Sequence, residues 1–156
     1  MLTEGFNHVA TITNDTARLH EFWVSVFDAE VTQGPEIPPE AGMKLSFVHI
    51  GPHSELNVFE IEGNTEADRQ KPDFGRGRLD HLAVHAASLE AFETIRERLI
   101  ARGAADAFVT DFGPMLSLFF RDPDGLECEV CIENPDAVPG VMNPPGTPAR
   151  RYVTAG

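Results

Sequence analysis

The chain contains one short pattern twice, first as Phe6-Asn7-His8-Val9-Ala10-Thr11 and again as Leu79-Asp80-His81-Leu82-Ala83-Val84. In both copies a histidine is the third residue of a β-type stretch, and an amphipathic segment follows. These segments cover residues 16–27 and 89–101, and each repeats apolar residues at the spacing of one helical face. The repeat therefore predicts two copies of one strand-and-helix unit, with a histidine at the equivalent place in each.

Three strand-like runs follow each predicted helix. They cover residues 29–33, 43–50 and 56–62 in the first half, and 107–112, 115–122 and 126–132 in the second. The turn Arg121-Asp122-Pro123-Asp124-Gly125 joins the last two runs, because proline presets φ and glycine accepts a positive φ. The order β-α-β-β-β thus occurs twice, which predicts an α+β fold of two βαβββ modules.

The composition of the remaining segments suggests where these modules end. We assign residues 1–65 to the first module, 66–78 to a linker, 79–134 to the second module and 135–156 to a proline-rich tail. Prolines and glycines exclude a helix in the tail and disfavour a central strand there. The tail could cover this domain, cover a partner subunit or be disordered, and the sequence leaves these alternatives open.

The composition excludes several classes of function. The chain has 156 residues, of which 42% are hydrophobic and 24% charged, as is typical of one globular domain. Lys plus Arg number 12 against 25 for Asp plus Glu, a formal net charge of −13 that disfavours nucleic acid and anionic membranes as partners. No apolar run is long enough to cross a bilayer and the N-terminus lacks the pattern of a secretion signal, so we expect a cytoplasmic protein.

Two cysteines, Cys128 and Cys131, form a C-x-x-C pattern inside a predicted strand. Residues three apart on a strand point to opposite faces, so the two sulfurs diverge. There is no second C-x-x-C to complete a zinc knuckle. We therefore expect small buried thiols here, and neither a redox pair nor a metal site.

Each half also ends its last strand with a carboxylate, Glu60 in the first and Glu129 in the second. Two similar halves that pair about a pseudo-two-fold axis bring equivalent positions face to face. His8, His81 and both carboxylates would then converge on one point, and this set suits a divalent ion such as zinc, nickel, manganese or iron. A one-residue change of register would turn Glu60 to the other sheet face, and Asn57 would then be the candidate.

Two further residues share strands with these candidates. His85 follows His81 by four residues, roughly 13 Å along a strand, which is too far to bind the same ion. It is therefore expected at the edge of a cavity, with a role as proton donor as the alternative. Glu127 points to the same side as Glu129 and could support it.

The chain resembles the vicinal oxygen chelate superfamily, which includes glyoxalase I, extradiol dioxygenases, methylmalonyl-CoA epimerase, and the fosfomycin and bleomycin resistance proteins. The resemblance covers residues 5–134 and is carried by the two histidine motifs and by Phe120-Arg121-Asp122-Pro123-Asp124-Gly125 leading to Glu129. It implies a cupped mixed sheet around a central cleft with a divalent metal. The positions of His8, His81 and Glu129 match those of the family's ligands, and Glu60 matches by its place near the end of a strand.

In this family the metal holds two adjacent substrate oxygens and stabilises an enolate-like oxyanion. The resemblance implies a homodimeric metal-dependent enzyme of lyase or isomerase type that acts on a small molecule, with Glu60 and Glu129 as candidate catalytic bases. One alternative is an iron(II) extradiol dioxygenase using His8, His81 and Glu129, which the single tyrosine, Tyr152 in the tail, disfavours. Another is a metal-free binding protein of the bleomycin-resistance kind. A fosfomycin-type activity is disfavoured because no Lys or Arg cluster lies beside the ligand strands.

Overall fold

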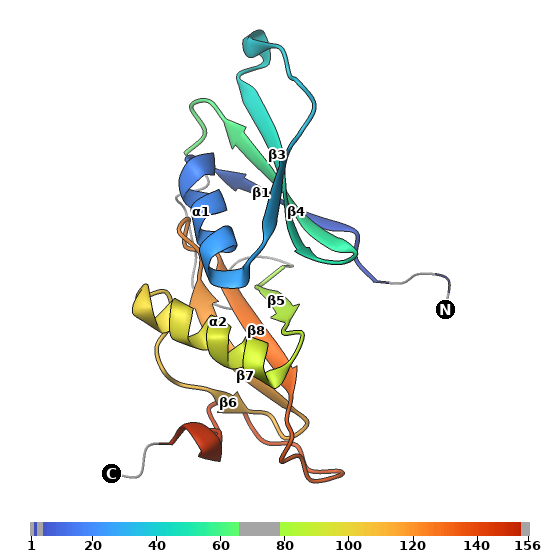
Figure 1. Ribbon diagram of the computed structural model, residues 1–156, viewed down its shortest axis with the longest axis vertical. Helices are drawn as coiled ribbons and strands as arrows, with labels where there is room; N and C mark the ends of the chain where they lie inside the picture. Colours follow the sequence, from blue (N-terminus) through green and yellow to red (C-terminus); the bar gives the residue numbers. More distant parts are fainter. Residues whose placement is uncertain (1, 3–4, 66–78, 154–156) are drawn as a thin grey trace. The chain divides into compact units, whose positions relative to one another are not determined.

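The computed structural model describes residues 2, 5–65 and 79–153, so the predicted linker 66–78 lies outside the described residues. The described residues form two compact units, one of residues 5–65 with the turn 123–125, the other of residues 79–122 and 126–153. Each unit contains a four-stranded mixed sheet and one α-helix (Figure 1). The predicted α+β fold with the order β-α-β-β-β in each half is confirmed.

The sheet of the first unit has the strand order β1-β4-β3-β2, in which β1 is parallel to β4 and the other pairs are antiparallel. Its elements are β1 (His8–Thr13), α1 (Thr16–Phe27), β2 (Glu30–Gln33), the 3₁₀ helix η1 (Pro39–Ala41), β3 (Met43–Gly51) and β4 (Ser54–Ile61). The helix has the bounds that the apolar spacing predicts.

Local chemistry sets both ends of α1. The Asp15 side chain accepts a hydrogen bond from the Arg18 amide at 3.0 Å, and the helix ends at Asp28 in the left-handed region with φ 53°. The apolar stripe of the helix is buried on the face of the sheet that also carries Val48, Leu56 and Val58. The buried members of the stripe are Leu19, Phe22, Trp23 and Val26. One face of this sheet is therefore core.

The sheet of the second unit repeats this topology in the order β5-β8-β7-β6, with β5 parallel to β8. Its elements are β5 (Leu82–His85), α2 (Leu89–Ala101), β6 (Thr110–Asp111), β7 (Met115–Arg121), β8 (Glu127–Glu133) and the 3₁₀ helix η3 (Arg150–Tyr152). Ser88 caps α2 by accepting a hydrogen bond from the Ala91 amide at 3.1 Å. Two strands differ from prediction: β5 begins after His81, and β6 is much shorter than the run 107–112.

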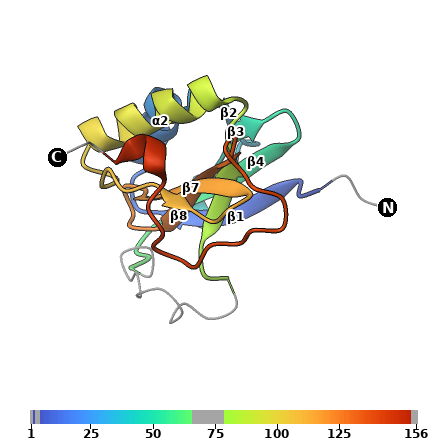
Figure 2. The same cartoon turned by 90° about the horizontal axis from the view of Figure 1, so that it is seen from below.

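The C-terminal tail covers the second unit. Its backbone pairs with the edge strand β6 through a Thr110–Pro148 bridge, and the Asp111 amide donates to the Thr147 carbonyl at 2.8 Å. The prediction that the tail contains no helix is wrong for Arg150–Tyr152, which follow the last proline and form η3. This 3₁₀ helix reaches α2 (Figure 2), where the Tyr152 hydroxyl donates to Glu93. The structure thus selects one of the alternatives that the sequence leaves open for this segment. Among the described residues, no helix is long and apolar enough to cross a membrane.

Candidate functional site

In the second unit, His81 and Glu129 lie together on the face of the sheet away from α2. The β5–β8 register pairs Ala83 with Glu129, so His81 lies two residues before the position opposite this glutamate and on the same face. The distance from His81 Nε2 to Glu129 Oε1 is 3.8 Å. Glu129 is buried, whereas His81 is partly exposed. The predicted proximity of these two residues is therefore present within one unit.

The His81 ring is oriented from two sides. Its Nδ1 lies 2.9 Å from Asp80 Oδ2, an acceptor that holds the proton on Nδ1 and leaves the Nε2 lone pair open beside Glu129. The ring also meets Phe119 edge-to-face, with 5.9 Å between the centroids. A carboxylate behind a histidine is the arrangement that fixes the tautomer of metal-binding imidazoles. Sequence reasoning missed Asp80, although its place directly before the repeated histidine was a usable signal.

Glu129 has a second neighbour, the buried thiol of Cys131. This thiol donates to Glu129 Oε2 at 3.4 Å. Burial, and then the charge of Glu129, raise the pKa of Cys131 to about 12, so the thiol stays protonated and acts as a donor. Cys128 lies on the opposite face of β8, and both cysteines are buried and outside any disulfide. The expected divergence of the two sulfurs is confirmed.

In the first unit, His8 is held in the same way by the residue before it. Its Nδ1 lies 2.8 Å from Asn7 Oδ1, so an amide oxygen takes the place that Asp80 has in the second unit. His8 is exposed on the face of the sheet away from α1. In both copies the hydrogen bond within the described residues is made by Nδ1, and Nε2 of the histidine makes none there.

Glu60 lies elsewhere in this unit. The β1–β4 register pairs His8 with Glu55 and Thr13 with Glu60, so Glu60 lies five residues farther along the strand and on the α1 face. There it accepts a hydrogen bond from the Thr16 amide at 2.9 Å and forms an ion pair with Lys44. The structure does not bring Glu60 together with His8. It makes this carboxylate a cap for the N-terminus of α1.

The position equivalent to Glu129 in the first unit belongs to Asn57. Asn57 is paired with Ala10, as Glu129 is paired with Ala83, and each alanine follows its histidine by two residues. The alternation of side chains along β4 explains why Asn57, and not Glu60, has this position. Asn57 and Glu60 are three residues apart and therefore point to opposite faces.

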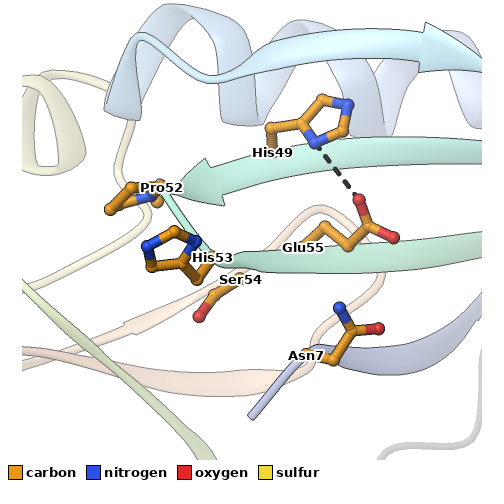
Figure 3. A pocket seen from close by; sticks show the side chains of 7 residues that line it. Asn7, His49, Pro52, His53, Ser54 and Glu55 are labelled. Atoms are coloured by element: carbon orange, nitrogen blue, oxygen red, sulfur yellow. Dashed lines mark ion pairs between the residues drawn. The ribbon is translucent and has the colours of Figure 1, made fainter. Parts of the chain in front are cut away.

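A polar pocket of about 250 Å³ lies at the turn between β3 and β4, and Asn7, His49 and Glu55 are among its lining residues (Figure 3). His49 Nδ1 lies 3.2 Å from Glu55 Oε2, and its Nε2 lies 2.9 Å from the Thr32 hydroxyl. Glu55 lies opposite His8 in the register, but its carboxylate pairs with His49 on the other neighbouring strand, β3.

The second unit repeats this pairing with an arginine. Arg121 lies opposite Glu127 on the adjacent strand, with 3.6 Å between Nη2 and Oε2. Glu127 is thus in an ion pair of its own.

His85 lies at the end of its strand, 3.1 Å from the exposed carboxylate of Glu133. No group of three or more His, Cys, Asp or Glu side chains is preassembled as a metal site within residues 5–65 and 79–153.

The capping role of Glu60 has a measurable consequence for stability. Hydrogen bonds from Lys44 and then from Thr16 lower the pKa of Glu60 from 4.5 to about 2. A lowered pKa stabilises the folded state above pH 4.5, and this contribution is lost as the pH falls toward 2. For Glu60→Gln we expect about 1–2 kcal/mol less stability at pH 7, after allowance for the exposed Lys44. The difference from the native chain should shrink in acid.

Urea unfolding at pH 7, 5 and 3 measures this difference. Glu133→Gln is the control, because the Glu133 side chain is 79% exposed and should give little change at any of these pH values. An unchanged stability of Glu60→Gln at pH 7 would contradict the capping role.

Comparison with known proteins now identifies the family. The model of the Glyoxalase/Bleomycin resistance protein/Dioxygenase superfamily matches residues 5–130. The chain belongs to this superfamily. Within it, the chain is 29% identical to a lactoylglutathione lyase of Escherichia coli O157:H7 over 136 residues, which are 87% of this chain and 97% of that protein. A lactoylglutathione lyase of Shigella flexneri has the same identity and coverage.

Solved structures of superfamily members have the same fold. A glyoxylase/bleomycin resistance protein/dioxygenase domain from Frankia sp. EAN1pec superposes with a TM-score of 0.68 at 20% identity, over 86% of this chain and 95% of that one. The glyoxalase I of Leishmania major gives 0.59 at 22% identity, over 82% and 86%. A mutant of the fosfomycin resistance protein FosX from Listeria monocytogenes, complexed with Mn(II), gives 0.62 at 21% identity, over 83% and 92%. Identities this low show the fold alone.

Proposed function

We propose that this superfamily member is a divalent-metal-dependent enzyme of lyase or isomerase type, which acts on a small molecule that offers two adjacent oxygens. The observation that carries the proposal is the Asp80–His81–Glu129 arrangement. It combines an imidazole of fixed tautomer with a buried carboxylate oxygen 3.8 Å from the open nitrogen. Two donors that share one ion through bonds of about 2.1 Å lie roughly 3.0–3.5 Å apart, so a small side-chain adjustment suffices.

The proposed protein ligands are His8, His81 and Glu129, and the candidate ions are zinc, nickel, manganese and iron. The bound ion would supply Lewis-acid stabilisation of negative charge on the substrate oxygens. Glu60 is left out, because Lys44 and Thr16 already engage its carboxylate. We propose a homodimer as the functional form, as the family resemblance implies.

Glu129 is the proposed proton-transfer base. A single carboxylate can take a proton from one carbon and return it to the neighbouring carbon, which is sufficient for an isomerisation. The two lactoylglutathione lyases suggest a first substrate to test, the adduct of a 2-oxoaldehyde with glutathione. Such an adduct carries two adjacent oxygens, and the adduct of methylglyoxal is an isomer of lactoylglutathione.

An extradiol-type dioxygenase is the second candidate, because the position of Glu60 leaves two histidines and one carboxylate as ligands. This set is typical of non-haem iron(II) sites. Against it, the Tyr152 hydroxyl donates to Glu93 on α2, on the helix side of its unit, and does not lie beside His81. The lyase or isomerase therefore remains the first proposal.

Elemental analysis of the purified chain, after reconstitution with each ion, tests the metal. We expect about one equivalent of metal in the native protein and a loss of most of it in the His8→Ala/His81→Ala double variant. His85→Ala is the matched control, because His85 lies four residues after His81, at the end of β5, and pairs with Glu133. Iron as the retained ion would favour the dioxygenase. A native chain that retains no ion would overturn the proposal and favour a metal-free binding protein.

A further inference from the structure

We infer that the Cys131 thiol positions the Glu129 carboxylate, by holding Oε2 in place while Oε1 stays turned toward Nε2 of His81. Cys131 is thus a positioning residue for the proposed reaction, which acts through Glu129. The inference rests on the proposed function, but the three residues that carry it all belong to the second unit. Three observations support it.

The first observation is that the two oxygens of Glu129 have different neighbours. The Cys131 thiol donates to Oε2, with 3.4 Å between sulfur and oxygen. Oε1 lies 3.8 Å from Nε2 of His81, which is longer than a hydrogen bond. A donor that holds one carboxylate oxygen also fixes the direction of the other oxygen. Oε1 is therefore the atom that is left to bind an ion or to take a proton.

The second observation is the burial of this carboxylate. Glu129 is only 7% exposed, and a buried carboxylate is destabilising unless hydrogen-bond donors satisfy it. Among the described residues, the side-chain hydrogen bond that Glu129 accepts comes from Cys131. The thiol therefore does more than fill apolar space, which is the usual role of a buried cysteine.

The other cysteine has a different neighbour. Cys128 is fully buried on the α2 face of β8, and its sulfur lies 3.7 Å from the carbonyl oxygen of Leu126, two residues before it. A backbone carbonyl so close in sequence cannot direct a distant side chain. Cys128 is thus a buried thiol without a link to Glu129, and it provides a matched control.

The third observation is the rigid frame around Cys131. The strand β8 is paired on both sides, and Cys131 lies opposite His85 on β5 and Ser117 on β7. The Ala86 amide also donates to the Cys131 carbonyl at 2.8 Å. Because the residue is 5% exposed, the thiol has little room to turn away from Glu129. A support on a central strand holds its target more precisely than a support on a loop.

The sequence repeat shows that the fold itself does not require a donor at this position. Phe59 has the equivalent place in the first unit, because it follows Asn57 by two residues as Cys131 follows Glu129. An aromatic side chain therefore suits this strand position where the preceding residue is an amide. The thiol is present in the unit that has the buried carboxylate.

The test compares the zinc affinity of variants of the full chain by competition with a chelating dye. We expect Cys131→Ala and Cys131→Val to bind zinc on the order of ten-fold more weakly, because Glu129 loses its fixed direction. Cys131→Ser restores a donor and should stay within about three-fold of the native chain. Cys128→Ala removes an equally buried thiol and should match the native affinity. Thermal unfolding without metal identifies the variants that are folded, and the valine variant replaces the alanine variant if the latter is not.

Infrared spectroscopy of the metal-free protein tests the hydrogen bond itself. A thiol that donates to a carboxylate absorbs at a lower S–H stretching frequency than a thiol without an acceptor. The chain has two cysteines, so Cys128→Ala leaves the band of Cys131 alone. In this background, Glu129→Leu should move the band to higher frequency, whereas the control Glu127→Gln should leave it in place. A band that does not move with Glu129→Leu would overturn the inference.

The two proposals fail in different ways. If His81→Ala loses the ion and the apolar variants of Cys131 bind it as tightly as the native chain, Cys131 does not position Glu129 and the proposed function stands. The same conclusion follows if Cys131→Ser binds as weakly as Cys131→Ala, because a donor then gives no rescue. If the native chain binds no ion, the proposed function itself fails, and this inference fails with it.

Discussion

Glu129→Gln is expected to weaken metal binding at least about a hundred-fold, equivalent to roughly 2.7 kcal/mol. The variant keeps the shape of the side chain and an oxygen that can accept from Cys131, but it removes the carboxylate charge beside His81 Nε2. A neutral amide is a much weaker ligand for a transition metal than a carboxylate is. If Glu129 also moves the proton, turnover of the methylglyoxal–glutathione adduct should fall by a similar or larger factor.

The matched control is Glu127→Gln. Glu127 lies two residues away on the same strand and the same face, but it pairs with Arg121 at 3.6 Å. Its replacement should change metal affinity less than about three-fold. Competition with a chelating dye measures both variants at one pH and one salt concentration. Equal affinities for Glu129→Gln and the native chain would remove Glu129 from the proposed site.

Gly113→Ala is expected to destabilise the protein by about 3 kcal/mol, the largest effect of a single methyl group that we predict. Gly113 has φ +97°, a backbone conformation that residues other than glycine rarely adopt. An added Cβ would lie 2.3 Å from the Val141 carbonyl oxygen. Its own backbone is fixed as well, because the Asn134 side chain donates to the Gly113 carbonyl at 2.8 Å. Neither the loop nor the tail can move without breaking such contacts.

Gly103→Ala is the control for backbone strain alone. Gly103 also has a positive φ, +66°, but an added Cβ would meet nothing within 4 Å. We expect Gly103→Ala to lose about 1 kcal/mol of stability. Any larger loss in Gly113→Ala then measures the contact with the tail. At about 2–4 °C per kcal/mol, Gly113→Ala should melt roughly 6–12 °C below the native chain. Thermal unfolding of both variants without metal tests this, and equal losses would contradict the close approach of Val141.

The helices could be predicted from sequence because their signals are local. Apolar spacing and the cap residues place α1 and α2 at the bounds that the structure has. The strand β6 could not be predicted in the same way, since one of its two partners, residue 148, comes from the distant tail. The run 107–112 shrinks to Thr110–Asp111, where β7 and residue 148 supply the hydrogen bonds.

The candidate site shows the same contrast. The duplication identifies His8 and His81, because the motif around each histidine is contiguous in sequence. It could not decide between Glu60 and Asn57, since that choice depends on the pairing of β4 with its neighbours, and β3 carries an irregularity between His49 and Gly51. One residue of register reverses the face of every side chain that follows. The ion pair of Lys44 with Glu60 is likewise a cross-strand contact and not a local pattern.

The pairing of the tail with β6 also bears on how this chain behaves among its own copies. An open edge strand is a template for a strand from another molecule, and proteins commonly protect such edges. Here the segment 147–149 already forms backbone hydrogen bonds at this edge. The Asp111 amide donates to the Thr147 carbonyl, and the Ala149 amide donates to the Val109 carbonyl. The tail is thus an intramolecular competitor of self-association, and a chain shortened before residue 147 would offer the same backbone groups to its neighbours.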